Sequence, residues 1–518
     1  MDKPRLPIAA FLLLILAIAL VYANSLSVDF IYDDYAFVYN NEAIRTFTPI
    51  GKFLFSPEAF SHPVSGHVYR PLASFTFALN YALNGLNPFG YHLVNILLHA
   101  LNVFLVFILL QQLGFQHQSS FVGALMFAVH AVHSEAVTWI AGRGNMLFLF
   151  FFLLAYVLYM RADSGSQRRR FLLTLVSAAA YGLSLLAKEM ALPLPIILFG
   201  HDLYFRRDRD LKAMLQRAWR YLPFVCVALA YMYLRLQVLG RIAQVQYHGG
   251  SAYVTFLMMI KAVVVYMRLM ALPTGLSLSR HFPPAYSILD ASVIPCFLVV
   301  ILGIAAAIFT FRRATYFSFA LYWFGVTLLP VSNIIPVNAI VADRFLYGPS
   351  VGFCILVAFV TAAALRERHL KQALAMWALL VMVFFQMTLT IGRNNDWKNA
   401  YVLWSKTAES SPTSFVAFNN LGFEYMKRGQ IVEAIEALSK ALALKSDLPE
   451  AHANLARCYV RLGHIDQAIY HYRAALDLPD SPEQLRLELE QLLGREGSEG
   501  KNAQQTERPA FNSGLRQR

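Results

Sequence analysis

The sequence has little charge. Only 14% of its 518 residues are Asp, Glu, Lys or Arg, whereas 57% are hydrophobic. This balance lies outside the range of ordinary soluble globular proteins. A helix crosses a bilayer core of about 30 Å with roughly 20 apolar residues, and such runs recur from residue 7 to about residue 391. Most of the chain is therefore predicted to lie in lipid.

Cysteine is scarce, and the signatures of soluble nucleotide enzymes are missing. The four cysteines are scattered without a CxxC pair, which argues against a disulfide framework or a zinc site. No GxGxxG fingerprint, P-loop or GxSxG elbow occurs, so a soluble nucleotide donor has no support. The net charge of +13 comes from Lys and Arg in short gaps between apolar runs. That pattern indicates membrane topology, and no nucleic-acid partner is expected.

Eleven apolar runs are predicted to cross the membrane. A cytoplasmic N-terminus places the basic gaps inside, as the positive-inside rule requires. Residues 7–22 resemble a signal peptide, but no small-residue cleavage site follows cleanly, so they are interpreted as a retained first helix. The runs are 7–24, 91–113, 119–140, 144–161, 171–187, 190–205, 219–239, 292–311, 316–333, 347–365 and 372–391.

Residues 253–272 form a twelfth apolar segment. Counting it as a crossing would place Arg312 and Arg313 outside and invert everything after them. A re-entrant or interface-lying helix is therefore preferred. Its Lys261 and Arg268 would suit a surface near phosphates, although they could equally snorkel from a true span.

The C-terminal part has the composition of a soluble domain, and a boundary is predicted near Gly392. Residues 415–448 and 449–482 align at a 34-residue period, with Asn420-Leu421-Gly422 matching Asn454-Leu455-Ala456. This is the tetratricopeptide (TPR) pattern. We expect a short α-solenoid over 392–495 that includes a cap helix, and a disordered tail over 496–518. Such repeats bind polypeptides in a concave groove, or they serve as a purely structural cap.

Ionisable residues gather at the external ends of the predicted spans, together with the long 25–90 loop. Each has a structural explanation when taken singly, as a solvated loop residue, an interior histidine or a turn pair. Their shared face favours a functional site, because ions close to lipid are costly. They are Asp33, Asp34, His130, His133, Glu135, Arg143, Lys188, Glu189, Asp343 and Arg344.

Acids beside several bases suit the transfer of a group that leaves with phosphate. A carboxylate can accept the proton of an attacking hydroxyl, and Arg and Lys neutralise the charge that develops on the leaving phosphate. Arginine adds bidentate contacts to phosphate oxygens. Carboxylate and imidazole could also bind a divalent cation, so metal dependence stays open.

Several motifs resemble a known family. They include Ile31-Tyr32-Asp33-Asp34, Tyr69-Arg70-Pro71-Leu72, the segment from Gly85 through His92 to Asn95, Phe127-Ala128-Val129-His130 with His133-Ser134-Glu135-Ala136-Val137, Gly142-Arg143, Leu186-Ala187-Lys188-Glu189 and Ala342-Asp343-Arg344-Phe345-Leu346-Tyr347. Together they look like the transmembrane and tetratricopeptide-repeat O-mannosyltransferases that target cadherins, and they match in order over nearly the whole chain.

This resemblance implies an all-α, GT-C type membrane glycosyltransferase with an outward-facing active site in the first external loop. The donor would be a sugar on a polyprenyl phosphate, which is dolichyl phosphate mannose in the animal members. Asp33 or Asp34 would be the essential acid. The chain shows about two clear repeats where the animal members carry many, which puts acceptor recognition in doubt.

The resulting hypothesis is an inverting or retaining transfer, with inversion favoured, of a hexose to a hydroxyl of a protein or glycan acceptor. Asp33 and Asp34 are the predicted catalytic residues, and Arg143, Lys188, Arg344 and Arg70 would hold the donor phosphate. The residues predicted to shape the pocket are His130, His133, Glu135, Glu189, Asp343 and His92.

Two other functions stay open at this point. A non-catalytic membrane scaffold would explain the repeats but not the converging charges, and a lipid-linked sugar transporter would need polar residues through the bilayer midplane. No Asn-x-Ser/Thr sequon occurs, which favours a bacterial inner membrane with a periplasmic TPR domain over the endoplasmic reticulum. The lipid carrier would then be undecaprenyl phosphate.

Overall fold

The computed structural model describes residues 8–506, apart from 48, 63–67, 164–165, 207–217, 241, 243–244, 281 and 480–482. All regular elements within these residues are helices, which confirms the predicted all-α class. The chain divides into two compact units, Met1–Val402 and Leu403–Arg518. The first unit thus extends past the predicted boundary, because the last turn of α16 (His369–Asn395) packs on α1 through a hydrogen bond from Asn394 Nδ2 to the Val21 carbonyl at 2.9 Å.

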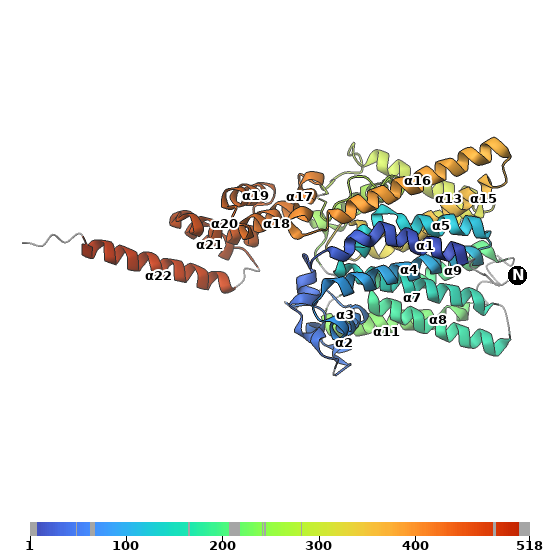
Figure 1. The fold of residues 1–518 in the computed structure, drawn as a ribbon, viewed down its shortest axis with the longest axis horizontal. Coiled ribbons are helices and arrows are strands. Elements are labelled where there is room, and N and C mark those ends of the chain that lie inside the picture. Colours follow the sequence, from blue (N-terminus) through green and yellow to red (C-terminus); the bar gives the residue numbers. More distant parts are fainter. Residues whose placement is uncertain are drawn as a thin grey trace, which may run out of the picture. The chain divides into compact units, whose positions relative to one another are not determined.

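The first unit is a bundle whose long helices run roughly parallel, with the N-terminus at one end and the short helices α2 and α3 at the other (Figure 1). Most of its long helices form where apolar runs were predicted, whereas α2 and α3 lie in the predicted external loop 25–90. The helices of this unit are α1 (Ile8–Tyr22), α2 (Lys52–Phe55), α3 (Pro71–Asn84), α4 (Pro88–Gln112), α5 (His117–Val129), α6 (Ser134–Val137), α7 (Arg143–Ala162), α8 (Gln167–Ala187), α9 (Leu194–Phe205), α11 (Leu222–Leu239), α12 (Ala252–Ala271), α13 (Ile294–Thr310), α14 (Thr315–Leu328), α15 (Ser350–Ala364) and α16.

Seven helices among the described residues are long and apolar enough to cross a membrane. α5 and the segment Ala131–Val137 meet the same criteria only when taken together, and the 46° bend between them is that of a broken span or a re-entrant loop; three more apolar helices are shorter. The protein is therefore an integral membrane protein with several crossings. The 190–205 run is helical only over the 12 residues of α9, about 18 Å, because the residues before it form the turn that carries Lys188 and Glu189.

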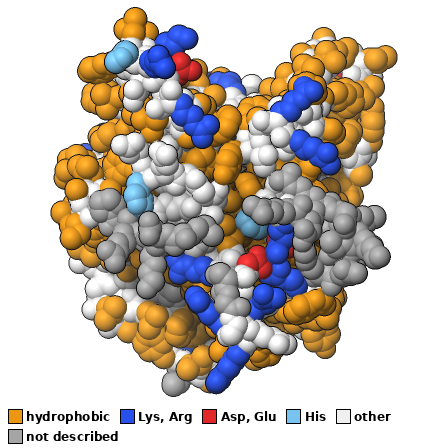
Figure 2. All heavy atoms as spheres, turned by 90° about the vertical axis from the view of Figure 1, so that its right-hand side faces the viewer, with side chains coloured by type: hydrophobic (Ala, Val, Ile, Leu, Met, Phe, Trp, Pro, Cys, Tyr) orange, Lys and Arg blue, Asp and Glu red, His pale blue; other side chains and the backbone are white. Residues whose placement is uncertain are grey.

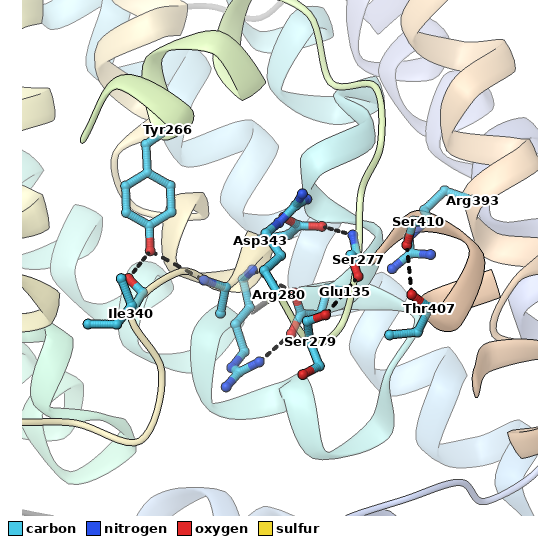
Figure 3. Close-up of polar contacts among 12 residues, drawn as sticks. Glu135, Tyr266, Ser277, Ser279, Arg280, Ile340, Asp343, Arg393, Thr407 and Ser410 are labelled. Atoms are coloured by element: carbon cyan, nitrogen blue, oxygen red, sulfur yellow. Dashed lines mark hydrogen bonds and ion pairs between the residues drawn. The ribbon is translucent and has the colours of Figure 1, made fainter. Parts of the chain in front are cut away.

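The helix α12 has the length and composition of a span, yet its contacts favour the predicted interface-lying orientation. His248, just before α12, bonds to the Val337 carbonyl at 2.8 Å, and Tyr266, near its end, bonds to the Ile340 carbonyl at 3.3 Å (Figure 3). Both carbonyls belong to the single connection between α14 and α15. A helix that crossed the bilayer would carry its two ends to opposite faces.

Basic side chains gather on the face of the bundle at the N-terminal end, as Figure 2 shows. Exposed Arg161 ends α7, Arg168 begins α8, Arg312 and Arg313 lie between α13 and α14, and Arg366 follows α15. This distribution agrees with the positive-inside pattern that the sequence predicts.

The second unit consists of helical hairpins with the TPR geometry. Its helices are α18 (Phe415–Lys427), α19 (Ile431–Leu444), α20 (Pro449–Leu462), α21 (Ile465–Leu476) and α22 (Glu483–Thr506), after α17 (Ala400–Ser410) at the boundary. Gly422 lets α18 approach α19, since an added Cβ would meet Leu438 Cγ at 2.6 Å. α22 caps the stack, and its helix includes 496–506, where a disordered tail was predicted; the remaining residues, 507–518, lie outside the described chain.

Candidate active site

The bend between α5 and α6 is stabilised by side chains that bond to the last three carbonyls of α5. These carbonyls have no partner along the helix once α5 ends, and in lipid such groups must be satisfied by other means. His133 Nδ1 bonds to Phe127, His99 Nε2 to Ala128 and Thr390 Oγ1 to Val129, at 2.9, 3.1 and 2.7 Å. The bend therefore has a defined structure, and it turns Glu135 toward the site.

The predicted pocket histidines serve this interior framework. His130 Nε2 bonds to the Met270 carbonyl at 3.0 Å, His133 Nε2 lies 2.9 Å from Ser350 Oγ, and His92 Nε2 bonds to the Val28 carbonyl at 3.0 Å. All three are buried and none lines the polar cavity described below. The described residues contain no group of three His, Cys, Asp or Glu side chains placed to hold a metal ion.

Arg143 is also a framework residue, although the sequence suggested a phosphate contact. Its guanidinium is fully buried and donates to Asn95 Oδ1 at 2.9 Å, Asn80 Oδ1 at 2.8 Å and the carbonyls of Thr76 and Tyr91. It also stacks over the Phe77 ring at 4.5 Å. These contacts join α7 to α3 and α4, and they use the donors that a phosphate would need.

The adjacent acids Asp33 and Asp34 have different environments. Asp34 is fully buried and accepts from the backbone N–H groups of Ile31 at 3.1 Å and Ala141 at 2.8 Å, which ties the loop after α1 to the start of α7. Burial raises the pKa of Asp34 to about 8, against the opposing effect of the two N–H groups. Asp33 is partly exposed and lines a cavity. Its carboxylate accepts no hydrogen bond from the described residues.

That polar cavity has a volume of about 120 Å³ and is lined by residues from five separate segments, 33–37, 68–70, 139–145, 188–190 and 330–345. Its ionisable lining residues are Asp33, Arg70, Lys188, Glu189 and Arg344. Burial raises the pKa of Asp33 to about 6, while Arg344 and Arg70 act in the opposite direction. Predicted residues from distant parts of the sequence thus meet in one small cavity.

Neighbouring side chains position the cations of this cavity and of the apolar pocket described below. Lys188 is buried and donates to Asn145 Oδ1 at 2.5 Å. Glu135 accepts from the Arg344 backbone N–H at 3.0 Å and also forms an ion pair with its guanidinium. Glu189 lies 3.5 Å from Arg235. Arg70 Nε is buried and has no hydrogen-bond partner in the described ranges, so Arg70 retains a donor for a ligand.

Asp343 lies behind the cavity wall and does not line it. It accepts from the Ser277 backbone N–H and from Arg280, both at 2.9 Å (Figure 3). These bonds fix the segment before α13 against the short helix η11 (Asp343–Leu346) that carries Arg344. The predicted role of Asp343 in shaping the pocket is therefore indirect.

An apolar pocket of about 260 Å³ adjoins the polar cavity and shares Glu189, Pro330 and Val337 with it. Its remaining lining is almost entirely aliphatic or proline, with Arg235 as its other ion. Sequence reasoning missed Arg235, Asn145 and Trp139 as lining residues of the two pockets. A polar side chain near the end of an apolar run was the available signal for Asn145 and Arg235.

The fold and the site thus define a polytopic membrane protein with a charged cavity and a TPR unit. Residues 61–236 match the family model described as dolichyl-phosphate-mannose-protein mannosyltransferase, and residues 422–463 and 449–478 match TPR models. "Protein O-mannosyl-transferase TMTC3" of Mus musculus is 28% identical and covers 90% of the chain. Tmtc3 of Drosophila melanogaster is 28% identical and covers 91%.

These matches confirm that the chain is related to the transmembrane and tetratricopeptide-repeat O-mannosyltransferases. The chain spans only 54% and 59% of those two relatives' own length. Among solved structures, ArnT from Cupriavidus metallidurans bound to undecaprenyl phosphate covers 90% of this chain and 79% of its own, at 12% identity and a TM-score of 0.44. That likeness is too remote to bear on function.

Proposed function

We propose that this protein is a GT-C type glycosyltransferase that moves a hexose, such as mannose, from a polyprenyl-phosphate carrier to a hydroxyl acceptor. One observation carries the proposal: the carboxylate of Asp33 accepts no hydrogen bond from any described residue, and it lines a small cavity with Arg70, Lys188 and Arg344. A base and several cations around one space are what transfer away from a phosphate requires. The mannosyltransferase names of the relatives support the same chemistry.

Asp33 is the proposed general base. It accepts the proton of the acceptor hydroxyl while the hydroxyl oxygen attacks the anomeric carbon, and the bond from that carbon to the phosphate oxygen breaks. A single displacement of this kind inverts the anomeric configuration. A pKa of about 6 leaves Asp33 mostly ionised at pH 7, yet more basic than an ordinary aspartate.

Arg70, Lys188 and Arg344 are the proposed phosphate-binding residues. As the phosphate leaves, its charge increases, and cations in a cavity sheltered from water stabilise that charge more strongly than they would in bulk solvent. Glu135 and Asn145 hold Arg344 and Lys188 in place. This arrangement reduces the reorganisation needed during the reaction.

The adjoining apolar pocket supports a lipid carrier. Its aliphatic lining begins where the charged cavity ends, at Glu189. A polyprenyl phosphate has a matching arrangement, because its charged phosphate is followed by an apolar chain. A free nucleotide sugar would leave this pocket unfilled.

The site is proposed to face the external side of the membrane, which is the periplasm in a bacterium or the lumen of the endoplasmic reticulum in a eukaryote. The basic gaps lie on the face of the bundle at the N-terminal end. The proposed acceptor is a protein Ser or Thr hydroxyl or a glycan, with the groove of the TPR unit as its proposed recognition surface.

The test uses the full chain in proteoliposomes with radiolabelled polyprenyl-phosphate mannose and Ser/Thr-containing peptides. Wild type should transfer label to peptide or, without acceptor, to water. Lys188→Met should lower kcat/KM by about 10- to 100-fold through the loss of a charged contact. Lys371→Met is the matched control, since Lys371 is exposed and does not line the cavity. Equal losses in both variants, or no transfer by wild type with either mannose or glucose donors, would contradict the proposal.

A further inference from the structure

Three aromatic rings form a column at the wall of the charged cavity. The ring of Trp139 stacks between those of Tyr32 and Trp397, with centroid distances of 6.1 Å on both sides and interplanar angles of 29° and 27°. The Arg344 guanidinium lies 5.6 Å from the Trp139 ring. The column therefore adjoins one of the proposed phosphate-binding cations, and Tyr32 directly precedes the proposed base.

The backbone of Trp139 is fixed between two short helices. It is extended, with φ −76° and ψ 124°, and precedes the turn Ile140–Gly142. Its carbonyl accepts from Asn95 Nδ2 at 3.1 Å and from the Gly142 backbone N–H at 3.0 Å. Tyr32 has a φ of +49°, which is costly for a residue other than glycine and tends to occur at functional sites.

Within the part of the chain that the structure describes, the indole N–H of Trp139 has no hydrogen-bond partner. The side chain is 5% exposed and lines the polar cavity, while its Nε1 is buried and unsatisfied. Buried donors in native proteins are nearly always paired, so an orphan beside a cavity calls for an explanation. A ligand in the cavity can supply the missing acceptor.

We propose that Trp139 recognises the transferred sugar by donating its indole N–H to one of the hexose hydroxyls. This inference rests on the proposed function and adds a specificity-determining residue to it. The indole is a neutral donor without acceptor capacity, which suits a hydroxyl, whereas the phosphate has three cations available. Tyr32 is 38% exposed and is the most accessible of the three aromatic residues.

Trp397 provides a matched control within the same column. Trp397 is fully buried, and its Nε1 also has no hydrogen-bond partner among the described residues. It does not line the polar cavity. Trp→Phe at either position removes one N–H and keeps an aromatic ring, so the two variants differ in their access to the ligand.

The first experiment compares full-length wild type, Trp139→Phe and Trp397→Phe in proteoliposomes. The probes are polyprenyl-phosphate mannose and the set of its monodeoxy analogues. Wild type and Trp397→Phe should transfer one analogue about 3- to 10-fold less efficiently in kcat/KM than the parent, the effect of one neutral hydrogen bond. Trp139→Phe should lose discrimination at that hydroxyl alone. An unchanged pattern in Trp139→Phe would overturn the inference.

A second measurement needs no folded Trp139 variant. The chain has six tryptophans, so indole N–H resonances of ¹⁵N-labelled protein can be assigned by single replacement of the other five. The Trp139 signal should shift with polyprenyl-phosphate mannose but not with polyprenyl phosphate alone. Transfer without this shift would overturn the role of Trp139 only, whereas the absence of transfer from every hexose donor would overturn the proposed function as well.

Discussion

Arg143 offers a sharp test of the structural assignments, because sequence and structure give it different roles. Arg143→Met removes a guanidinium that donates to four acceptors, two of which are the side-chain oxygens of Asn80 and Asn95. Each buried acceptor left without a donor costs about 1–3 kcal/mol. Relief from burying a charge offsets part of that cost, so about 4 kcal/mol is a reasonable net loss, within the range for broken buried charge networks.

The loss should appear as instability, with little effect on donor binding. At about 2 °C per kcal/mol for a large domain, the apparent melting temperature in detergent should fall by roughly 8 °C. The donor KM of the protein that remains folded should change less than about threefold, since the side chain does not line the cavity. Exposed Arg313→Met serves as the control. An unchanged melting temperature together with a donor KM raised by tenfold or more would refute the framework role.

Two further predictions follow from the cavity. Because burial raises the pKa of Asp33 to about 6, Asp33 becomes protonated and can no longer act as a base as the pH falls through that value. When kcat/KM is measured from pH 4.5 to 8, it should drop about tenfold per pH unit below roughly pH 6. A flat profile would contradict the assignment. Glu135→Gln should raise the donor KM about tenfold, because it removes a charge-assisted bond to Arg344. The control variant Lys371→Met should leave the donor KM nearly unchanged. An equal change of the donor KM in both variants would argue against positioning of Arg344 by Glu135.

The sequence allowed the helical architecture and most of the cavity to be predicted. Asp33, Arg70, Lys188 and Arg344 lie far apart in the chain. Lys188 lies between two predicted apolar runs, Arg344 precedes one, and Asp33 and Arg70 lie in the predicted external loop 25–90. The number of predicted membrane crossings between them places all four on the same side of the membrane. The structure brings them together in one cavity.

The roles of the neighbouring residues could not be read from the sequence, because they depend on tertiary partners. Arg143 and Lys188 are both cations at the ends of apolar runs. Arg143 is a framework residue only because Asn80 and Asn95 lie within hydrogen-bond distance of its guanidinium. Similarly, a histidine after α5 can bind a metal, line a pocket or cap a carbonyl. Because the chain bends at residue 130, the His133 side chain turns back and bonds to the Phe127 carbonyl.

The central claim is that Asp33, and not its neighbour, removes the acceptor proton. The most direct test is single-turnover transfer of mannose from polyprenyl phosphate by purified Asp33→Asn and Asp34→Asn, at a temperature where both are folded. Asp33→Asn should be slower than wild type by about 10²- to 10⁴-fold, while Asp34→Asn should stay within about tenfold, since its carboxylate only accepts backbone N–H groups. Transfer at the wild-type rate by Asp33→Asn would contradict the account.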